Sequence, residues 1–127
     1  MKEIHYYEAN DGMKFDDYWE CVDYERQKAF EAHKDEFQFF DYYKRPIPIE
    51  EALIESICYI TIKSDACAEM LGKWFEDSGS FDPFGGVYCE CVGTWVYGEM
   101  IDRGDEWLKL ELEIEKIQTL INEVNKQ

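Results

Sequence analysis

The chain has 127 residues, and its 29 acidic and 13 basic side chains give a formal net charge of -16. This charge repels phosphate backbones and argues against general binding of DNA or RNA. The acidity could keep an aromatic-rich protein in solution, or it could let the chain compete with nucleic acid for a basic groove on another protein. Nine tyrosines, eight phenylalanines and four tryptophans exceed the needs of one small core, so some aromatic surface is expected to contact a ligand, a partner or another copy.

Cysteine usage and hydropathy set the expected compartment. The five cysteines are an odd number, and the sequence shows no signal peptide, which predicts free thiols in a reducing cytoplasm. No apolar run approaches the length of a membrane span, so the protein is expected to be soluble. With no repeat or linker, residues 1–127 are expected to form a single domain.

The N-terminal quarter predicts a hairpin followed by a helix. Side chains alternate from Ile4 to Ala9 as in a strand, the tight-turn sequence Asn10-Asp11-Gly12 follows, and residues 13–15 return as a second strand. Asp17 with Glu20 three positions later has the spacing of a capping box, which predicts a helix over about residues 18–34.

The middle of the chain predicts two strands and two helices. Residues 37–43 alternate enough for a strand, and the two prolines at 46 and 48 keep the next segment extended. A short helix is predicted over 49–55, and the β-branched run 57–62 is the strongest strand of the sequence. Ser64 is placed to cap a helix over 65–76, which Gly79 ends.

Residues 81–97 predict a loop and a second hairpin. The loop 81–86 carries two phenylalanines expected to be exposed, and strands over 87–92 and 95–97 would pair across Gly93-Thr94. Cys89 and Cys91 would then share one strand face, but the remaining Cys and His residues are too scattered for a zinc site. Buried cysteines are therefore expected, without a metal or cofactor.

The run 105–125 predicts a long C-terminal helix capped by Asp105. Apolar residues recur at alternating spacings of three and four and form one seam: Trp107, Leu110, Ile114, Ile117, Ile121 and Val124. Such a seam fits a core helix, and it also fits a helix that contacts another copy. Together the elements predict an α+β fold: one domain with a mostly antiparallel sheet of about five strands, helices on one face, and a C-terminal helix that helps to build a homo-oligomer.

No catalytic signature is present, and a non-enzymatic protein is expected. Neither histidine has the context of a nucleophile's base, and no glycine-rich phosphate loop precedes a helix. Carboxylate pairs arise by chance in so acidic a chain, and they carry no information on acid–base chemistry.

The opening of the chain resembles that of small accessory proteins of phages that infect Firmicutes. The resemblance is carried by Tyr6-Tyr-Glu-Ala-Asn-Asp-Gly12 with Phe15, Cys21 and Tyr24-Glu25, and by a closing Trp-led helix over 107–124. It covers the first quarter and the last fifth of the sequence. Among these phage proteins, the chain is most similar to the Thoeris anti-defence proteins of the first type. That resemblance implies a counter-defence protein, a sponge that sequesters cyclic ADP-ribose isomers or cyclic oligonucleotides without cleaving them, as a dimer or larger assembly.

Candidate ligand contacts come from the residue chemistry, because arginines beside aromatic rings can hold a base and its phosphates. The stacking candidates are Phe84, Trp95 and Tyr97, and the candidates for phosphate or ribose contact are Arg103, Arg45 and Arg26. Each arginine could instead pair with a neighbouring acid.

A rival interpretation uses the charge directly. An anti-CRISPR or anti-restriction protein can imitate DNA by presenting carboxylates to a basic nuclease of the host, with a steep salt dependence. The carboxylates that could build such a surface are Asp16, Asp17, Glu20, Asp23, Glu111, Glu113 and Glu115. A structural or assembly protein of a virion is a third possibility. The expected partners are a small nucleotide signal and further copies, or a nuclease under the rival interpretation, with no direct contact to nucleic acid or membrane.

Overall fold

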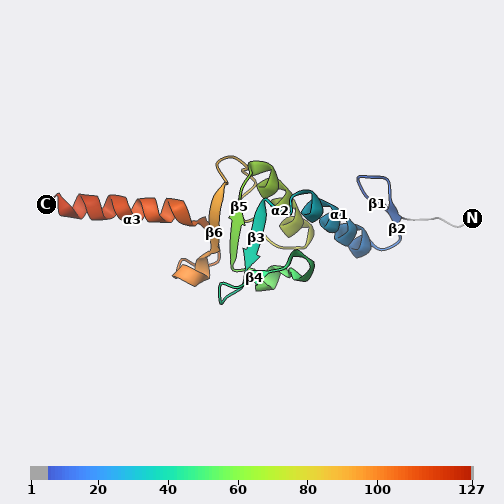
Figure 1. Cartoon of the computed structure of the whole chain (residues 1–127), viewed down its shortest axis with the longest axis horizontal. Helices are drawn as coiled ribbons and strands as arrows, with labels where there is room; N and C mark the ends of the chain where they lie inside the picture. The colour runs from blue at the N-terminus through green and yellow to red at the C-terminus, as the bar shows by residue number, and fades with distance from the viewer. Residues whose placement is uncertain (1–5, 127) are drawn as a thin grey trace, which may run out of the picture. The chain divides into compact units, whose positions relative to one another are not determined.

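The computed structural model describes residues 6–126 and has an α+β fold with a helix at the C-terminus, as the sequence predicts (Figure 1). The contacts divide the chain into two compact units, residues 1–34 and 35–127, where the sequence shows no boundary. Each unit is described by itself. No helix within residues 6–126 is long and apolar enough to cross a membrane.

The first unit contains the predicted hairpin. β1 (Tyr7–Glu8) pairs antiparallel with β2 (Lys14–Phe15), and the Ala9 amide donates to the Met13 carbonyl at 2.8 Å. Gly12 supplies the turn with a φ of 92°. Ile4 and His5, which begin the predicted first strand, lie outside the described residues.

Helix α1 (Tyr18–Ala32) follows, and its predicted cap is confirmed because the Asp17 side chain accepts from the Trp19 amide at 2.8 Å. Two side chains of the helix also form hydrogen bonds with the hairpin turn. The Tyr24 hydroxyl donates to Asp11, which lowers the pKa of that carboxyl, and Glu25 accepts from the Asn10 amide at 2.9 Å.

The second unit is built on a five-stranded antiparallel sheet with the order β4-β3-β5-β6-β7. Its strands are β3 (Phe37–Phe40), β4 (Pro46–Ile47), β5 (Tyr59–Ile62), β6 (Gly93–Tyr97) and β7 (Trp107–Lys109). Two short 3-10 helices, η1 (Ile49–Glu51) and η2 (Ile54–Ser56), replace the single helix predicted over 49–55. They are separate because Ala52 and Leu53 both have extended backbone angles.

Helix α2 (Asp65–Asp77) packs on the sheet face that carries Phe39 and Ile60, which lie opposite each other in the register. Ser64 caps the helix as predicted, since its hydroxyl accepts from the Cys67 amide at 3.1 Å. The Trp74 ring stacks on Phe39 with 5.8 Å between centroids. The side chains that α2 buries are Cys67, Ala68, Leu71, Trp74 and Phe75. This interface is the core of the unit.

The prediction of one helix over 105–125 is wrong in its first part. Residues 107–109 form β7 and pair with β6, and helix α3 (Leu110–Asn125) begins afterwards (Figure 1). The apolar spacing of Trp107 and Leu110 is compatible with a helix, but the open edge of β6 satisfies the backbone of 107–109 with ladder hydrogen bonds. Asp105 is therefore not a cap, and no side chain caps α3 at Lys109.

The hairpin predicted over 87–97 is also wrong, because residues 87–92 form no strand. Asp65, in the first turn of α2, accepts from the amides of Glu90 at 3.3 Å and Cys91 at 2.9 Å. The Lys109 ammonium donates to the Glu90 carbonyl at 2.8 Å, and Glu90 has a φ of 58°. These bonds hold the segment as an irregular loop in which Cys89 is exposed and Cys91 is buried.

Candidate functional site

A pocket of about 580 Å³ opens in the second unit. Its walls come from η2, the residues just before β5, the end of α2 and the loop after it, the end of β6, the 3-10 helix η3 (Gly98–Ile101) and the start of β7. The lining residues are Ile54, Glu55, Ile57, Cys58, Phe75, Gly79, Ser80, Phe81, Tyr97, Glu99, Met100, Asp105 and Trp107. We call it the acidic-aromatic pocket.

Three of the aromatic rings that line the pocket form a chain of contacts. Phe75 is buried and meets the Trp107 ring edge-on, with 6.1 Å between centroids and an interplanar angle of 90°. Tyr97 lies opposite Trp107 in the β6–β7 register, and their ring centroids are 5.6 Å apart. Because Tyr97 and Trp107 are only half-buried, their rings are available to a bound group.

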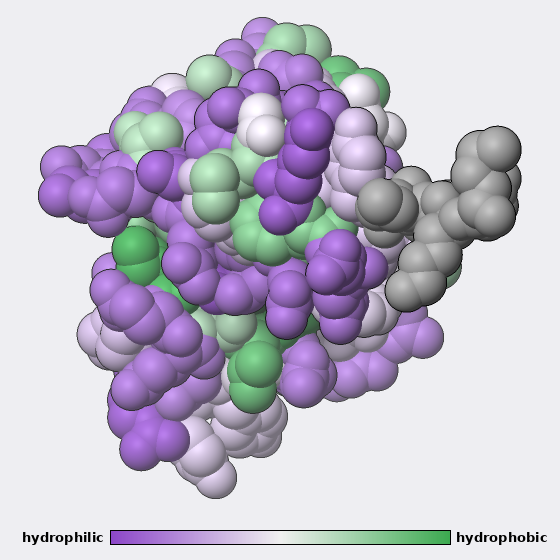
Figure 2. Space-filling model, turned by 90° about the vertical axis from the view of Figure 1, so that its right-hand side faces the viewer, coloured by the Kyte–Doolittle hydropathy of each residue, from purple (hydrophilic) through white to green (hydrophobic). Residues whose placement is uncertain are grey.

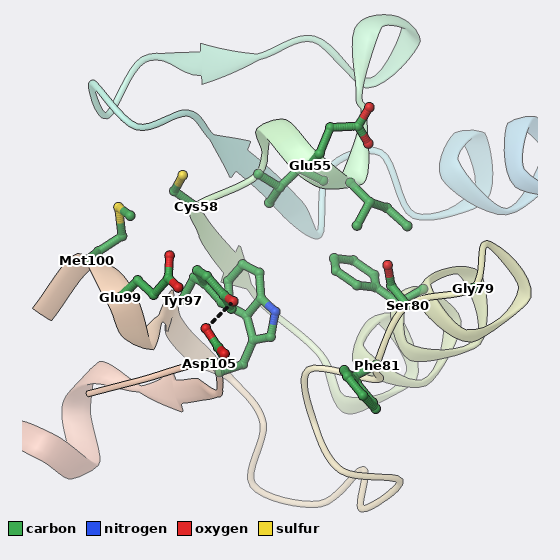
Figure 3. Close-up of a pocket in the computed structure, with 13 residues that line it drawn as sticks. Glu55, Cys58, Gly79, Ser80, Phe81, Tyr97, Glu99, Met100 and Asp105 are labelled. Atoms are coloured by element: carbon green, nitrogen blue, oxygen red, sulfur yellow. Dashed lines mark hydrogen bonds between the residues drawn. The ribbon is translucent and has the colours of Figure 1, made fainter. Parts of the chain in front are cut away.

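Carboxylates gather beside these rings. Asp105 accepts a hydrogen bond of 3.1 Å from the Tyr97 hydroxyl, and Figure 3 shows the Glu99 side chain next to this pair. A hydrogen bond with Asp105, together with its negative charge, raises the pKa of Glu99. Burial and the bond to Asp105 raise the pKa of Tyr97. The lining includes a third carboxylate, Glu55, and no Lys, Arg or His, so the pocket concentrates negative charge.

The tight connection between β6 and β7 brings Glu99 and Asp105 together. The Gly98 amide donates to the Glu106 carbonyl at 2.6 Å, and the Arg103 amide donates to the Gly98 carbonyl at 2.8 Å. A Cβ on Gly98 would lie 2.6 Å from the Gly104 carbonyl oxygen, closer than real Cβ contacts. Only glycine at position 98 therefore lets the loop close this tightly.

Of the six residues predicted to bind a ligand, Tyr97 alone lines this pocket. Phe84 and Trp95 contact each other, with ring centroids 4.8 Å apart at 85°. Phe84 is buried, contrary to the exposed loop position expected for it, because Asp82 accepts from the amides of Phe84 and Gly86 and turns the loop inward. The Trp95 indole donates to the Cys91 carbonyl at 2.8 Å. These two rings pack against each other, and they do not form an open surface on which a base could stack.

The three predicted arginines each meet an acidic neighbour, which is the alternative that the sequence left open. Arg103 lies 3.6 Å from Glu113. Arg26 belongs to the first unit and lies 2.7 Å from Asp23.

Arg45 lines a second hollow of about 470 Å³, together with Tyr43. It lies 3.0 Å from Asp41 and 5.0 Å from the centre of the Tyr43 ring. Within the second unit, Tyr97 thus lines the acidic-aromatic pocket, and Arg45 lines the second hollow.

Sequence reasoning missed most of the pocket. The sequence pattern predicts a helix for Asp105 and Trp107 and an exposed loop for Phe81, and it predicts no role for Glu99. Phe81 is indeed exposed, at the far side of the pocket from Glu99 (Figure 3). A signal for the pocket is present in the sequence, because Glu99 and Asp105 each lie two positions from an aromatic strand end, Tyr97 and Trp107 respectively.

No group of three or more His, Cys, Asp or Glu side chains within 6–126 could hold a metal ion. Comparison with protein-family models, with curated proteins and with solved structures finds no match for this chain.

Proposed function

We propose that this chain is a non-enzymatic inhibitor that binds a basic, nucleic-acid-handling protein and receives one of its Arg or Lys side chains in the acidic-aromatic pocket. The observation that supports this proposal is the composition of the pocket. It combines the half-buried rings of Tyr97 and Trp107 with three carboxylates and contains no basic residue.

The chemistry favours a guanidinium or ammonium group. A cation over an indole or phenol ring gains about 0.5–2 kcal/mol, depending on how far it is desolvated. Glu99 and Asp105 add charge-assisted hydrogen bonds, for which the planar arginine side chain is best suited. A bound cation also relieves the repulsion between these two carboxylates, so binding it lowers the raised pKa of Glu99.

The charge of the whole chain acts in the same direction. A net charge of -16 attracts a basic surface over long range, and hydrophilic side chains dominate the face in Figure 2. The association rate constant should therefore be high at low salt and should fall as the ionic strength rises. The resemblance to phage accessory proteins supplies the setting, the cytoplasm of a bacterial host whose nucleases are the basic partners.

The nucleotide sponge is the second candidate, and the pocket size favours it. A volume of about 580 Å³ falls within the range of roughly 300–1,000 Å³ typical of small-molecule sites, and Tyr97 was a predicted stacking residue. Carboxylates can accept from ribose hydroxyls. The phosphates would have to face away from the wall, because no lining residue is basic.

Calorimetry with a blocked hexa-arginine peptide tests the pocket. The double variant Glu99→Gln with Asp105→Asn should weaken binding about tenfold, the equivalent of one lost charge-assisted contact. A control variant, Glu20→Gln with Glu123→Gln, removes the same charge at exposed positions outside the pocket and should weaken binding less than threefold. Equal losses in both variants would show that net charge alone binds the peptide, and the pocket proposal would fail.

Phage plating separates the two candidate functions. The chain is expressed in hosts that carry restriction, CRISPR or Thoeris systems, and the plating of a sensitive phage is counted. Rescue against a restriction or CRISPR nuclease, lost in the pocket variant and kept in the control, is the expected result. Rescue against Thoeris alone would overturn the inhibitor and support the sponge.

A further inference from the structure

Helix α3 has an apolar face that nothing in its own unit covers. Its first turn contacts β6 and β7, and every residue from 114 to 126 is exposed. In Figure 1, no other element of residues 35–126 lies alongside the outer part of the helix. The exposed apolar side chains are Ile114 (58%), Ile117 (50%), Leu120 (59%), Ile121 (46%) and Val124 (61%). Within residues 35–126, the outer part of α3 is therefore not a core helix.

A lone helix of this length is poorly stable in water. Peptide helices shorter than about 12–15 residues are marginal even with favourable sequences, and most helices in proteins depend on packing of an apolar face. The exposed part of α3 covers residues 114–125, and no side chain caps the start of the helix at Lys109. The sequence therefore specifies a helix that needs a partner.

The spacing of the exposed residues is that of a coiled coil. Ile114 and Ile121 occupy a positions of a heptad, and Ile117 and Val124 occupy d positions. Branched Ile at both a and d shifts the preference from two strands to three or four. A helix that binds in the groove of an unrelated protein does not need this heptad spacing. Helices of identical chains that pack side by side in a coiled coil do need it.

The charges along the seam favour identical copies as the partner. The flanking e and g positions of the outer heptads are Gln118, Leu120 and Asn125, none of which is charged. Glu113, at the preceding g position, is buried and lies 3.2 Å from Lys116. Two copies can thus meet here without like-charge repulsion, although each chain carries a charge of -16.

The exposed apolar area of the seam bears on how many neighbouring helices can cover it. A large aliphatic side chain offers about 100 Å² of apolar surface, so the five exposed residues offer roughly 500 Å². A standard two-body interface buries about 800 Å² on each partner. A single neighbouring helix would cover only part of this apolar surface. In a three-stranded bundle each helix packs against two others, and Leu120 at the flank of the seam is covered as well.

We propose that the exposed part of α3 packs against α3 of two further copies to form a three-stranded coiled coil. Three copies related by a three-fold axis are parallel, so all three sheets attach at the same end of the bundle. Ile114, Ile117, Ile121 and Val124 form the dry interior. Gln118 and Asn125 line its edge.

The test is the mass of the full chain in solution, measured by sedimentation equilibrium. The wild type should have three times the 15.2 kDa mass of one chain at micromolar concentration. Ile117→Asp places a charge in the seam and should reduce the mass to one chain. Thr119→Asp adds the same charge on the outer f position and should keep three copies.

The result can also contradict the proposal in three ways. A wild type with the mass of one chain would overturn it, as would a mass of two chains. So would an assembly that persists unchanged in Ile117→Asp. Circular dichroism of both variants shows whether the sheet-bearing unit is still folded, so that a lost assembly can be attributed to the seam.

Discussion

Helices α2 and α3 have similar amphipathic sequences and opposite surroundings. α2 places five large or small apolar side chains among the buried residues, while the one residue that α3 buries is Glu113. α2 starts at a side-chain cap and lies on the sheet, whereas α3 starts uncapped from a short edge strand and leaves the sheet after one turn. An amphipathic pattern thus indicates that the apolar face of a helix needs a packing partner. It does not indicate whether that partner lies in the same chain.

The two helices meet indirectly at the acidic-aromatic pocket. Phe75 lies near the end of α2, and Trp107 lies in the strand that leads into α3. Their rings are in edge-on contact. The pocket therefore lies between the core helix α2 and the start of the exposed helix α3. Substitutions in α2, at the pocket and in α3 should then have different effects on stability and binding.

The largest expected effect is in α2. Leu71 is completely buried, so Leu71→Ala should lower the free energy of unfolding by about 2–5 kcal/mol through lost transfer energy and the cavity left behind. Because its neighbours are in the same chain, the loss should be the same at all protein concentrations. Chemical denaturation at two concentrations measures it, and a loss that depends on concentration would place α2 in an intermolecular contact.

The next effect is at the base of α3. Gly98→Ala forces a Cβ to within 2.6 Å of the Gly104 carbonyl oxygen, and overpacking of this kind typically costs about 1–3 kcal/mol. The β6–β7 connection should open, and binding of the arginine peptide should fall because Glu99 and Asp105 separate. Gly85→Ala is a control outside the pocket lining, because there is open space around its Cβ and its positive φ of 64° also makes alanine costly. Equal loss of peptide binding in both variants would contradict the role given to the loop.

A smaller effect on the single chain is expected in α3. Ile117→Ala removes a side chain that is half exposed, so the unfolding free energy of the dilute, unassembled chain should change by at most about 0.5 kcal/mol. At high concentration the same variant should be less stable than the wild type, since assembly adds stability by mass action. Denaturation curves across a concentration series measure both regimes. A large loss in the dilute chain would mean that α3 packs on its own unit.

The smallest effect is a pH dependence of the pocket. The pKa of Glu99 is raised, so the folded chain holds its proton more tightly than the unfolded chain, and the ionised group opposes folding. The stabilising contribution of the protonated group is therefore lost as the pH rises through that pKa. Glu99→Gln should match the wild type in acid and be slightly more stable at neutral pH. Thermal unfolding of both proteins over a pH series checks this, and parallel curves would show that the carboxylate pair is not strained.

Local signals in the sequence predicted local structure well. The turn at Asn10 to Gly12 and the caps Asp17 and Ser64 act within a few residues, and all of them appear as predicted. The β-branched run that became β5 and the antiparallel class of the sheet were also predicted.

The errors arose where a distant segment competed with a local preference. Trp107 fits a helical period, but the edge of β6 recruits it into a strand. Cys89 and Cys91 fit a strand, but the Asp65 carboxylate holds the backbone beside them in a loop. The pocket was missed for the same reason. Glu99 and Asp105 lie on the β6–β7 connection, and they converge only when both strands pair.

Hydrogen exchange tests directly whether the partner of α2 lies in its own chain and the partner of α3 in other copies. Amide exchange in α2 and in residues 114–125 of α3 is followed at a high and a low protein concentration. We expect α2 to be protected at both concentrations, and α3 to be protected at high concentration and to exchange rapidly on dilution. Protection of α3 that is independent of concentration would contradict the claim that other copies supply its partner, and so would rapid exchange at both concentrations.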